Sequence, residues 1–358
     1  MGWAKQSARL DYRDDGILIF SFNPIPNPLP SRPVVTQPFK SIVVVGSGAV
    51  GSFYGAMLAR AGHRVTLIGR ALHVQAIEKH GLQLHMAGRV EVVKIGATTE
   101  LSAVRGADLV LFCVKSSDTD ALARQIAPLL DANAIVLSLQ NGVDNARVLA
   151  LHINHHATQL VVPTAVYVAT AMPEAGVVQH FGRGDLAIGT VHAQAQSAAN
   201  EKRLQTVVDL FATAQVPVRI SPDVMRELWS KLLVNCAYNA ISAVSQMPYG
   251  KMAALPAIVE TQHAVVREVV AVALANGQKL LLADSLQAVE RIAIDMPEQL
   301  SSTAQDIARG KPTEIDHLNG FIARRGAELG VATPVNQALF SLVKLLEVGR
   351  VKAKTSQA

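Results

Sequence analysis

Residues 42–51 read IVVVGSGAVG, and the order of residue types in this stretch predicts a strand, a glycine turn and a helix. The apolar run Ile42–Val45 is typical of a buried strand, and the Ala-rich stretch Phe53–Ala61 is amphipathic. The first glycine permits a tight turn, the second lets a pyrophosphate approach the backbone, and the third lets helix and strand pack closely. Because a second apolar run, Val65–Ile68, closes a βαβ unit of the expected length, the stretch predicts a dinucleotide-binding turn.

The residue pair after the second strand indicates which dinucleotide binds. About twenty residues beyond the glycine turn, an NAD-binding unit carries Asp or Glu, which accepts hydrogen bonds from the ribose hydroxyls. This chain has Gly69-Arg70 there instead. A guanidinium suits a 2′-phosphate, so the sequence favours NADPH over NADH. The alternative is that Arg70 is a solvated cation at the end of a strand.

The composition indicates a globular chain of more than one domain. Of its 358 residues, 50% are hydrophobic and 17% are charged, which is enough for two domains and a large core. No apolar run approaches the roughly 20 residues of a membrane span. The net charge is +5, but the basic residues are dispersed and no Lys/Arg block alternates with aromatics. We therefore expect neither a nucleic acid nor a membrane as a partner.

The two cysteines, Cys113 and Cys236, lie in apolar segments and form neither a disulfide framework nor a CxxC zinc pattern. This usage predicts a reducing, cytoplasmic setting and no metal site. The sequence also lacks the GxSxG and HExxH motifs, which argues against hydrolytic and zinc chemistry.

The chain divides into segments with different sequence patterns. Residues 1–39 hold closely spaced prolines at 24–30 and lack the basic start and long apolar core of a secretory signal, so we expect a disordered extension. From residue 40 to 220, apolar runs such as 108–114 and 134–139 alternate with helical stretches, which is typical of strands buried on both faces of a parallel sheet. Hairpin strands that extend this sheet are expected at 160–170, 177–181 and 185–189.

After Ser221-Pro222 the pattern becomes helical. The spacing of Ala, Leu and Val predicts an all-α domain over residues 221–350, followed by a tail at 351–358. The predicted fold class is α/β, with an N-terminal Rossmann-type doubly wound parallel sheet and a second, all-helical domain. The helices of the second domain are expected at 225–247, 258–282, 286–309, 314–329 and 336–348.

One of these predicted helices carries polar residues on an otherwise apolar surface. Within residues 228–239, Lys231, Asn235 and Asn239 stand four residues apart and therefore share one face. An ammonium and two amides in such a helix are costly unless they have partners or line a binding site. A structural alternative is a Glu227–Lys231 ion pair, with Asn side chains that bond neighbouring backbone groups.

Further polar motifs follow nearer the C-terminus, where Thr313 is typical of an N-cap and Glu314 of a first-turn acid. With these motifs the chain resembles the 2-dehydropantoate (ketopantoate) 2-reductase family from about Lys40 to Glu347. The resemblance rests on several separated motifs with matching spacings. They are the glycine turn, Val114-Lys115, Gln140-Asn141-Gly142, Trp229 with Lys231, Asn235 and Asn239, Ser301-Ser302 with Gln305-Asp306, and Glu314-Ile315-Asp316 with Asn319-Gly320.

The resemblance implies NADPH-dependent reduction of 2-dehydropantoate to pantoate, a step of pantothenate and coenzyme A biosynthesis. It implies that Lys231 is the general acid and that Glu314 supports it. A hydride that reaches a ketone carbon leaves negative charge on the oxygen, and a lysine whose pKa is lowered by partial burial can protonate that oxygen near neutral pH. The implied substrate-binding residues are Asn141, Asn235, Asn239 and Ser302. The cofactor-binding residues, predicted from the turn or implied by the family, are Gly46, Ser47, Gly48, Ala49, Val50, Gly51, Arg70, Lys115 and Asn141.

Two positions depart from the family pattern. Tyr249-Gly250 stands where many members have Asn before Gly, and Ala240 follows Asn239 where Pro is frequent. Tyr249 can reshape a substrate pocket, so a reductase of another 2-oxo acid stays an alternative. A non-catalytic NADP-binding sensor is a second alternative, against which the retained Lys231 argues. The expected partner is a small-molecule 2-oxo acid, with a homodimer as a candidate assembly.

Overall fold

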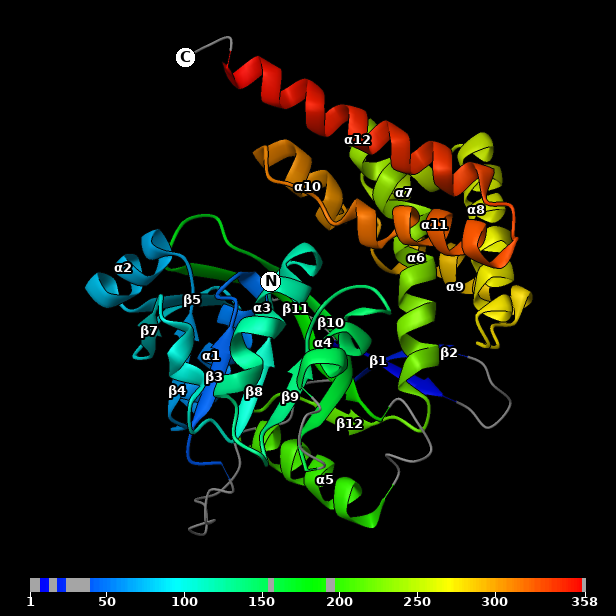
Figure 1. Ribbon diagram of the computed structural model, residues 1–358. Coiled ribbons are helices and arrows are strands. Elements are labelled where there is room, and N and C mark those ends of the chain that lie inside the picture. Colours follow the sequence, from blue (N-terminus) through cyan, green and yellow to red (C-terminus); the bar gives the residue numbers. More distant parts are fainter. Residues whose placement is uncertain (1–6, 13–17, 24–38, 154–157, 191–196, 356–358) are drawn as a thin grey trace. The chain divides into compact units, whose positions relative to one another are not determined.

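The computed structural model describes residues 7–12, 18–23, 39–153, 158–190 and 197–355. These residues divide into two compact units (Figure 1). The first unit consists chiefly of residues 19–224, and the second chiefly of residues 225–358.

A ten-stranded sheet forms the first unit. The strands lie in the order β6-β5-β11-β10-β9-β8-β3-β4-β7, and β12 pairs with β11. The centre of the sheet is parallel, which confirms the predicted Rossmann-type arrangement. Its four strands have continuous apolar sequences and are β3 (Ile42–Val45), β4 (Val65–Ile68), β8 (Leu109–Phe112) and β9 (Ile135–Ser138).

The four central strands end level with one another. Val45 lies opposite both Ile68 and Phe112 in the sheet, and Phe112 lies opposite Ser138. Because the strands are parallel, the four segments that follow them all leave the same edge. In open parallel sheets this carboxyl edge is where ligands bind.

Alternate residues of β3 pack on opposite faces of the sheet, because successive side chains of a strand point to opposite sides. Ile42 and Val44 belong to the apolar core on one face, and Val43 and Val45 belong to the core on the other. All four residues are at most 1% exposed. Helices cover both faces, as the doubly wound prediction requires (Figure 1). They are α1 (Ala49–Arg60) and α5 (Ala198–Thr213) on the first face, and α3 (Thr119–Ile126) and α4 (Asn145–Ile153) on the second.

A long antiparallel hairpin extends the sheet, as predicted. β10 (Leu160–Ala171) pairs with β9 and with β11 (Val177–Ile188). The two runs expected at 177–181 and 185–189 form one strand, because bulges at Phe181 and Gly184 absorb the residues that have no partner. The peripheral strands were not predicted, since they are short and the first four residues of β6 are exposed. They are β5 (Leu82–Met86), β6 (Arg89–Val93), β7 (Gly96–Thr98) and β12 (Val218–Ile220).

The segment predicted to be a disordered extension contains two described strands. β1 (Ser7–Tyr12) and β2 (Leu18–Asn23) pair in a separate two-stranded sheet. The other residues of this segment up to 38 lie outside the described residues, so the predicted disorder stays a prediction. The remaining elements of residues 39–224 are α2 (Ala71–His80) and short 3₁₀ turns at Leu101–Val104, Ser116–Asp118 and Ala127–Leu129.

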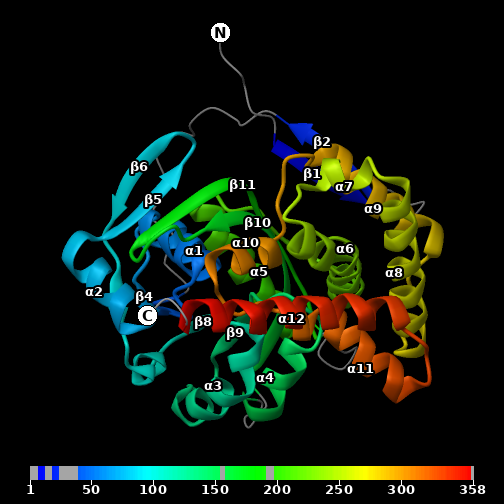
Figure 2. The ribbon, with the colours of Figure 1, turned by 90° about the horizontal axis from the view of Figure 1, so that it is seen from above.

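Between residues 225 and 355 all regular elements are helices, which confirms the predicted helical domain (Figure 2). The long helix α12 packs against α8 and α11. No helix in the described part of the chain is both long enough and apolar enough to cross a membrane. The helices are α6 (Val224–Ser245), α7 (Tyr249–Ala253), α8 (Pro256–Ala275), α9 (Leu282–Asp295), α10 (Ser302–Arg309), α11 (Asn319–Leu329) and α12 (Pro334–Thr355).

Several predicted helix boundaries are wrong. The segment 286–309 is divided between α9 and α10, and Ser301 caps the second helix by accepting the N–H of Ala304 at 3.0 Å. The predicted helix 258–282 is too long, because the chain leaves α8 after Ala275 and Gly277 has a φ of +80°. The predicted helix 314–329 begins as a 3₁₀ turn, Ile315–His317, and α7 was not predicted.

Each unit holds one of the two cysteines, and both thiols are free. Cys113 follows β8 in the first unit and is half-buried, whereas Cys236 lies in α6 at 0% exposure. Burial raises the pKa of both thiols.

Candidate active site

The glycine turn is fastened to the end of β4. The backbone N–H groups of Gly46 and Ser47 both donate to the carbonyl oxygen of Ile68, at 3.0 and 3.1 Å. Gly46 has a φ of +102°, and a Cβ atom on this residue would meet the backbone nitrogen of Val114 at 2.7 Å. Only glycine satisfies both conditions, so the backbone dictates the first position of the motif.

The other two glycines of the motif differ from each other. A Cβ atom on Gly51 would collide with the carbonyl oxygen of Gly46, so Gly51 permits the close approach of α1 to the turn. A Cβ atom on Gly48 would meet no atom within 4 Å, so this residue borders open space. Gly48 is also the N-cap of α1, and no side chain caps this helix. The turn therefore offers backbone N–H groups to an anion, and its residues fit a dinucleotide phosphate.

Arg70 lies beside the glycine turn. It is the exposed N-cap of α2, two residues after the end of β4. The intervening residue, Gly69, packs against the side chain of Ser47, with which a Cβ atom at position 69 would collide. The guanidinium is thus carried by a segment in contact with the turn, at the strand end where dinucleotide-binding folds place the residue that contacts the ribose or its 2′-phosphate.

Lys115 and Asn141 follow the next two strands of the sheet, β8 and β9. Lys115 is exposed and Asn141 is half-buried. The carbonyl oxygen of Asn141 accepts hydrogen bonds from the Ser116 hydroxyl at 3.2 Å and from Asn145 Nδ2 at 2.6 Å. Asn145 Nδ2 also donates to Ser116 Oγ at 3.1 Å. These bonds join the two segments, so the predicted cofactor residues all lie at the carboxyl edge of the central strands.

Three buried polar residues that were not predicted as site residues hold these segments. Gln140 Nε2 donates to the carbonyl oxygen of Val114 at 3.1 Å and to Thr119 Oγ1 at 2.7 Å. Thr119 Oγ1 donates in turn to Asn145 Oδ1 at 3.1 Å. Gln140, Thr119 and Asn145 are all buried. The signal that could have revealed these three residues is their position soon after an apolar strand. A polar residue there is expected to be buried and therefore to need a hydrogen-bond partner.

In the second unit, the polar stripe formed by Lys231, Asn235 and Asn239 lies on α6. Lys231 and Asn235 are half-buried, and Asn239 is 2% exposed. The Ser301 hydroxyl donates to the carbonyl oxygen of Asn239 at 3.3 Å. Ser302 is exposed and is the first residue of α10. The structure therefore brings the start of α10 to the Asn239 end of the polar stripe.

Helix α11 is fastened to α6 at two points. Asn319, its first residue, donates through Nδ2 to the carbonyl oxygen of Cys236 at 3.0 Å. Phe321 packs edge-to-face on Trp229, with ring centroids 5.9 Å apart. Glu314 is half-buried and precedes the 3₁₀ turn that leads into α11. The helix that follows Glu314 is thus tied to the helix that carries the polar stripe.

Helix α12 anchors the segment that carries Glu314. The N–H and the hydroxyl of Thr313 both donate to Glu347 Oε1, at 2.8 and 2.7 Å. Lys344 Nζ pairs with Glu347 Oε2 at 2.7 Å and with Asp316 Oδ2 at 2.9 Å. Burial alone would raise the pKa of Glu347, but hydrogen bonds from Lys344 and Thr313 hold it below its usual range. No local pattern in the sequence indicates either α12 residue.

Tyr249, which departs from the family pattern, is an interior residue. It begins α7, is 9% exposed and lies with its ring centroid 4.5 Å from that of Tyr238 in α6. Burial raises the pKa of Tyr249, and interaction with Tyr238 raises it further. Because Tyr238 directly precedes Asn239, the size of residue 249 affects the packing of α6 beside the polar stripe.

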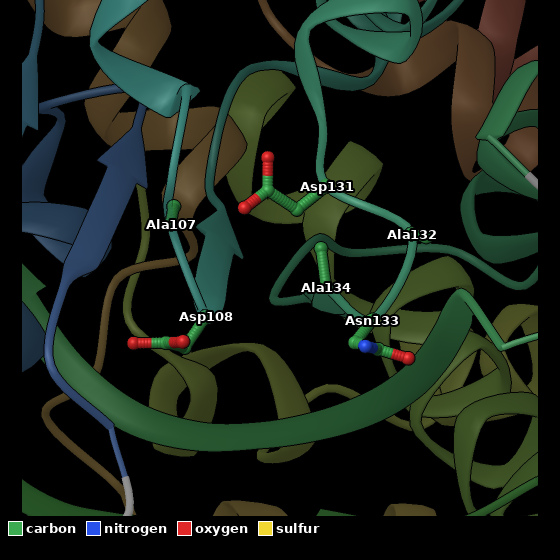
Figure 3. Close-up of a pocket in the computed structure, with 6 residues that line it drawn as sticks. All are labelled: Ala107, Asp108, Asp131, Ala132, Asn133 and Ala134. Carbon is green, nitrogen blue, oxygen red and sulfur yellow. The ribbon is translucent and has the colours of Figure 1, made fainter.

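A pocket of about 360 Å³ opens at the amino ends of β8 and β9 (Figure 3). This edge of the sheet is opposite to the one that carries the glycine turn. The Asp108 carboxylate accepts the N–H groups of Lys40 and Ser41 at 2.7 and 3.0 Å, which is a structural role. Among the described residues, no three His, Cys, Asp or Glu side chains are grouped to hold a metal ion. The pocket is lined by Ala107, Asp108, Asp131, Ala132, Asn133 and Ala134, none of which was predicted as a site residue.

Two family models match the chain over both units. One is described as "Ketopantoate reductase PanE/ApbA" and matches residues 42–193. The other is described as "Ketopantoate reductase PanE/ApbA C terminal" and matches residues 223–347. The chain belongs to the ketopantoate reductase family. The two matched ranges contain every residue predicted for the site, and the resemblance inferred from the motifs is confirmed.

Relatives of this ketopantoate reductase family member align along nearly their whole length. A 2-dehydropantoate 2-reductase of Halobacterium salinarum is 35% identical over 86% of this chain and 98% of the relative. A ketopantoate reductase structure from Ralstonia eutropha is 48% identical, with a TM-score of 0.79 over 86% of this chain and 99% of that one. A D-mandelate dehydrogenase solved with NADH and anilino(oxo)acetate is 25% identical, with a TM-score of 0.79 over 86% of this chain and 98% of that one. The chain is thus an oxidoreductase, and its family and neighbours indicate a nicotinamide cofactor.

Proposed function

We propose that this protein reduces 2-dehydropantoate to pantoate with NADPH, in the synthesis of pantothenate and coenzyme A. The observation that carries the proposal is the polar stripe on α6. An ammonium and two amides lie on one face of a helix whose other residues are largely apolar, and relatives of the chain are named 2-dehydropantoate 2-reductases. A sensor that only binds a dinucleotide has no need of a proton donor at that place.

The site residues of the second unit have separate roles in this mechanism. The cofactor supplies the hydride when it is bound. Lys231 donates a proton to the ketone oxygen as negative charge develops there, which contributes about 10²–10⁴-fold to the rate. Asn235 and Asn239 donate hydrogen bonds to substrate oxygens, and Ser302 lies near the substrate carboxylate. Glu314 supports the ammonium of Lys231 and orients the substrate.

The residues of the first unit bind the dinucleotide in this mechanism. The glycine turn holds the pyrophosphate through its backbone N–H groups. Arg70 pairs with the 2′-phosphate through charge-assisted hydrogen bonds, which is the reason to propose NADPH rather than NADH. Lys115 and Asn141 contact the nicotinamide half, and Asn141 also contacts the substrate. Arg70→Ala should therefore weaken NADPH binding and leave NADH binding nearly unchanged.

A second candidate function is the reduction of another 2-oxo acid, including one with an aromatic group. Two observations favour its inclusion: Tyr249 replaces the Asn of many family members, and a D-mandelate dehydrogenase shares the fold at a TM-score of 0.79. That neighbour was solved with NADH. Initial rates of NADPH and NADH oxidation with ketopantoate, 2-oxoisovalerate and phenylglyoxylate would distinguish these candidates. A higher kcat/KM for phenylglyoxylate than for ketopantoate would displace the first proposal.

The role of Lys231 is tested by Lys231→Ala, with Lys251→Ala as a matched control. Lys251 is exposed and lies in the short helix α7. We expect Lys231→Ala to lower kcat by about 10²–10⁴-fold while the Kd of NADPH changes by a few-fold at most. A folded Lys231→Ala protein with normal kcat and a lowered Tm would instead identify Lys231 as one half of a structural ion pair.

A further inference from the structure

One buried histidine bridges three segments of the first unit. His73, in the first turn of α2, is 7% exposed. Its Nδ1 atom lies 2.9 Å from the backbone nitrogen of Gly176, which directly precedes β11. Its Nε2 atom lies 3.2 Å from the hydroxyl oxygen of Ser52 in α1. Neither His73 nor its partners belongs to the predicted site.

The partners of the ring determine which nitrogen carries the proton. A backbone N–H can only donate, so Nδ1 of His73 accepts from Gly176 and carries no proton. The proton of the neutral ring is then on Nε2, which donates to Ser52 Oγ. The Ser52 hydroxyl donates in turn to the carbonyl oxygen of Ser47 at 3.0 Å. Burial lowers the pKa of His73, as does the charge of Arg70, and both favour the neutral ring.

This chain of hydrogen bonds ends inside the glycine turn. The N–H of Ser47 donates to Ile68, and its side chain lies against Gly69. Its carbonyl oxygen is held by the Ser52 hydroxyl. Without a donor at position 73, that hydroxyl can rotate toward the carbonyl of Gly48, one helical turn earlier, as serines in helices commonly do.

The carbonyl of Ser47 and the N–H of Gly48 belong to one planar peptide group. Their directions are therefore coupled, and holding the oxygen on one side directs the N–H to the other. Gly48 is the residue of the turn that borders open space. The direction of its N–H decides how well the turn can bind an anion.

We propose that His73 is a positioning residue for the dinucleotide, which acts through Ser52 on the peptide group between Ser47 and Gly48. The inference rests on the proposed cofactor function and adds a residue outside the motif to it. Because the peptide group serves the pyrophosphate, which both dinucleotides share, loss of His73 weakens NADPH and NADH by the same factor. Loss of Arg70 weakens NADPH alone.

The test compares His73→Asn, Ser52→Ala and a matched control, His63→Asn. An Asn at position 73 keeps an acceptor near Gly176 and removes the donor to Ser52. His63 is also 7% exposed and also bonds a hydroxyl, that of Thr213, at 2.6 Å, but it precedes β4 at the opposite edge of the sheet. The Kd values of NADPH and NADH are measured by fluorescence titration, and Tm is measured on the same samples.

We expect His73→Asn and Ser52→Ala each to raise both Kd values on the order of tenfold, the effect of one lost buried hydrogen bond. The double variant should bind about as weakly as either single variant, because both break the same chain of bonds. His63→Asn should lower Tm with no change in either Kd. The ¹⁵N signals of the His73 ring can be identified because they are absent from the spectrum of His73→Asn. In the unaltered protein these signals should be those of a neutral ring protonated at Nε2.

The inference fails if both single variants are folded and bind NADPH and NADH within twofold of the unaltered protein. It also fails if His63→Asn raises the Kd values as much as His73→Asn. Failure of the unaltered protein to bind either dinucleotide would refute the proposed function itself, and the inference with it.

Discussion

The glycine turn of the first unit and the Glu314 segment of the second unit are held in different ways. The turn is held by backbone hydrogen bonds, as at Gly46, and by close packing that only glycine permits, as at Gly46 and Gly51. Charged side chains of α12 hold the segment at Thr313 and Asp316. The first kind of support depends mainly on shape and on backbone hydrogen bonds. The second depends on charges contributed by residues some 30 positions later, so it can be weakened without disturbing the backbone.

Among changes to the two supports, the largest effect is expected from Gly51→Ala, which disturbs the support by shape. The added methyl collides with the Gly46 carbonyl oxygen and must push α1 away from the turn. Overpacking of this kind costs about 1–3 kcal/mol of the free energy of unfolding. Displacement of the turn should also weaken NADPH binding by about a hundredfold. Urea unfolding and fluorescence titration measure the two effects.

Gly48→Ala is the control for this prediction. Its methyl group meets no protein atom within 4 Å, so the free energy of unfolding should stay the same or rise slightly. It should nonetheless weaken NADPH binding, because it occupies the space that we assign to the phosphate. Equal losses of stability in the two variants would show that the turn is not held by close packing.

Glu347→Gln attacks the support by charge and should have a smaller effect. It removes the ion pair with Lys344 and weakens the two hydrogen bonds from Thr313. We expect a loss of about 1 kcal/mol in the free energy of unfolding and a decrease of about tenfold in kcat, since Glu314 is held less firmly. The Kd of NADPH should not change. Steady-state kinetics and urea unfolding provide these values.

Glu328→Gln is the matched control, because Glu328 pairs with Arg325 at the surface at 2.7 Å. Exposed ion pairs contribute little, so neither kcat nor Tm should change measurably. If Glu347→Gln behaved in the same way, the segment would be held by something other than α12.

The dependence of stability on pH sharpens the comparison further. The pKa of His73 is lowered by burial and by the charge of Arg70. The unfolded ring binds a proton near pH 6.5, whereas the folded ring binds one only at lower pH. The unfolded state therefore holds more protons in that interval, and the free energy of unfolding decreases as pH falls below about 6.5. In His73→Asn this decrease should be shallower than in the unaltered protein, as urea unfolding at a series of pH values would show.

The smallest effect is expected from deletion of residues 1–37. The first family match begins at residue 42, and the Ralstonia eutropha structure aligns over 99% of its length with 86% of this chain. The truncated protein should therefore keep its kcat and its Tm within error. A large loss of either would show that the extension contributes to one of the two supports.

These two kinds of support also explain which features were predictable from sequence. The glycine turn was predictable because a backbone constraint restricts residue types at fixed spacing. Strands β8 and β9 were predictable because burial on both faces leaves a continuous apolar run. The stripe on α6 was visible because helical periodicity places residues four apart on one face.

Features that depend on distant partners were not predictable. Nothing near position 347 indicates a bond to Thr313, which is 34 residues away. Gly176 lies 103 residues from His73, so the role of that histidine has no local pattern. Strands β5 and β6 were missed because each has only five residues, and the first four residues of β6 are exposed. The break between α9 and α10 was missed because apolar residues continue with helical spacing on both sides of it.

The two cysteines provide one thiol probe in each unit of the protein. Thiolates, not thiols, react with alkylating reagents, and burial raises the pKa of Cys113 and of Cys236, so both should react slowly in the folded protein. Since each unit contains one of them, the alkylation rate of each cysteine reports how accessible the thiol of that unit is. Cys113 also packs beneath the glycine turn, where a Cβ atom on Gly51 would come within 3.1 Å of its own. A bound dinucleotide should therefore slow the alkylation of Cys113 more than that of Cys236. Peptide mass spectrometry can measure both rates in a single sample.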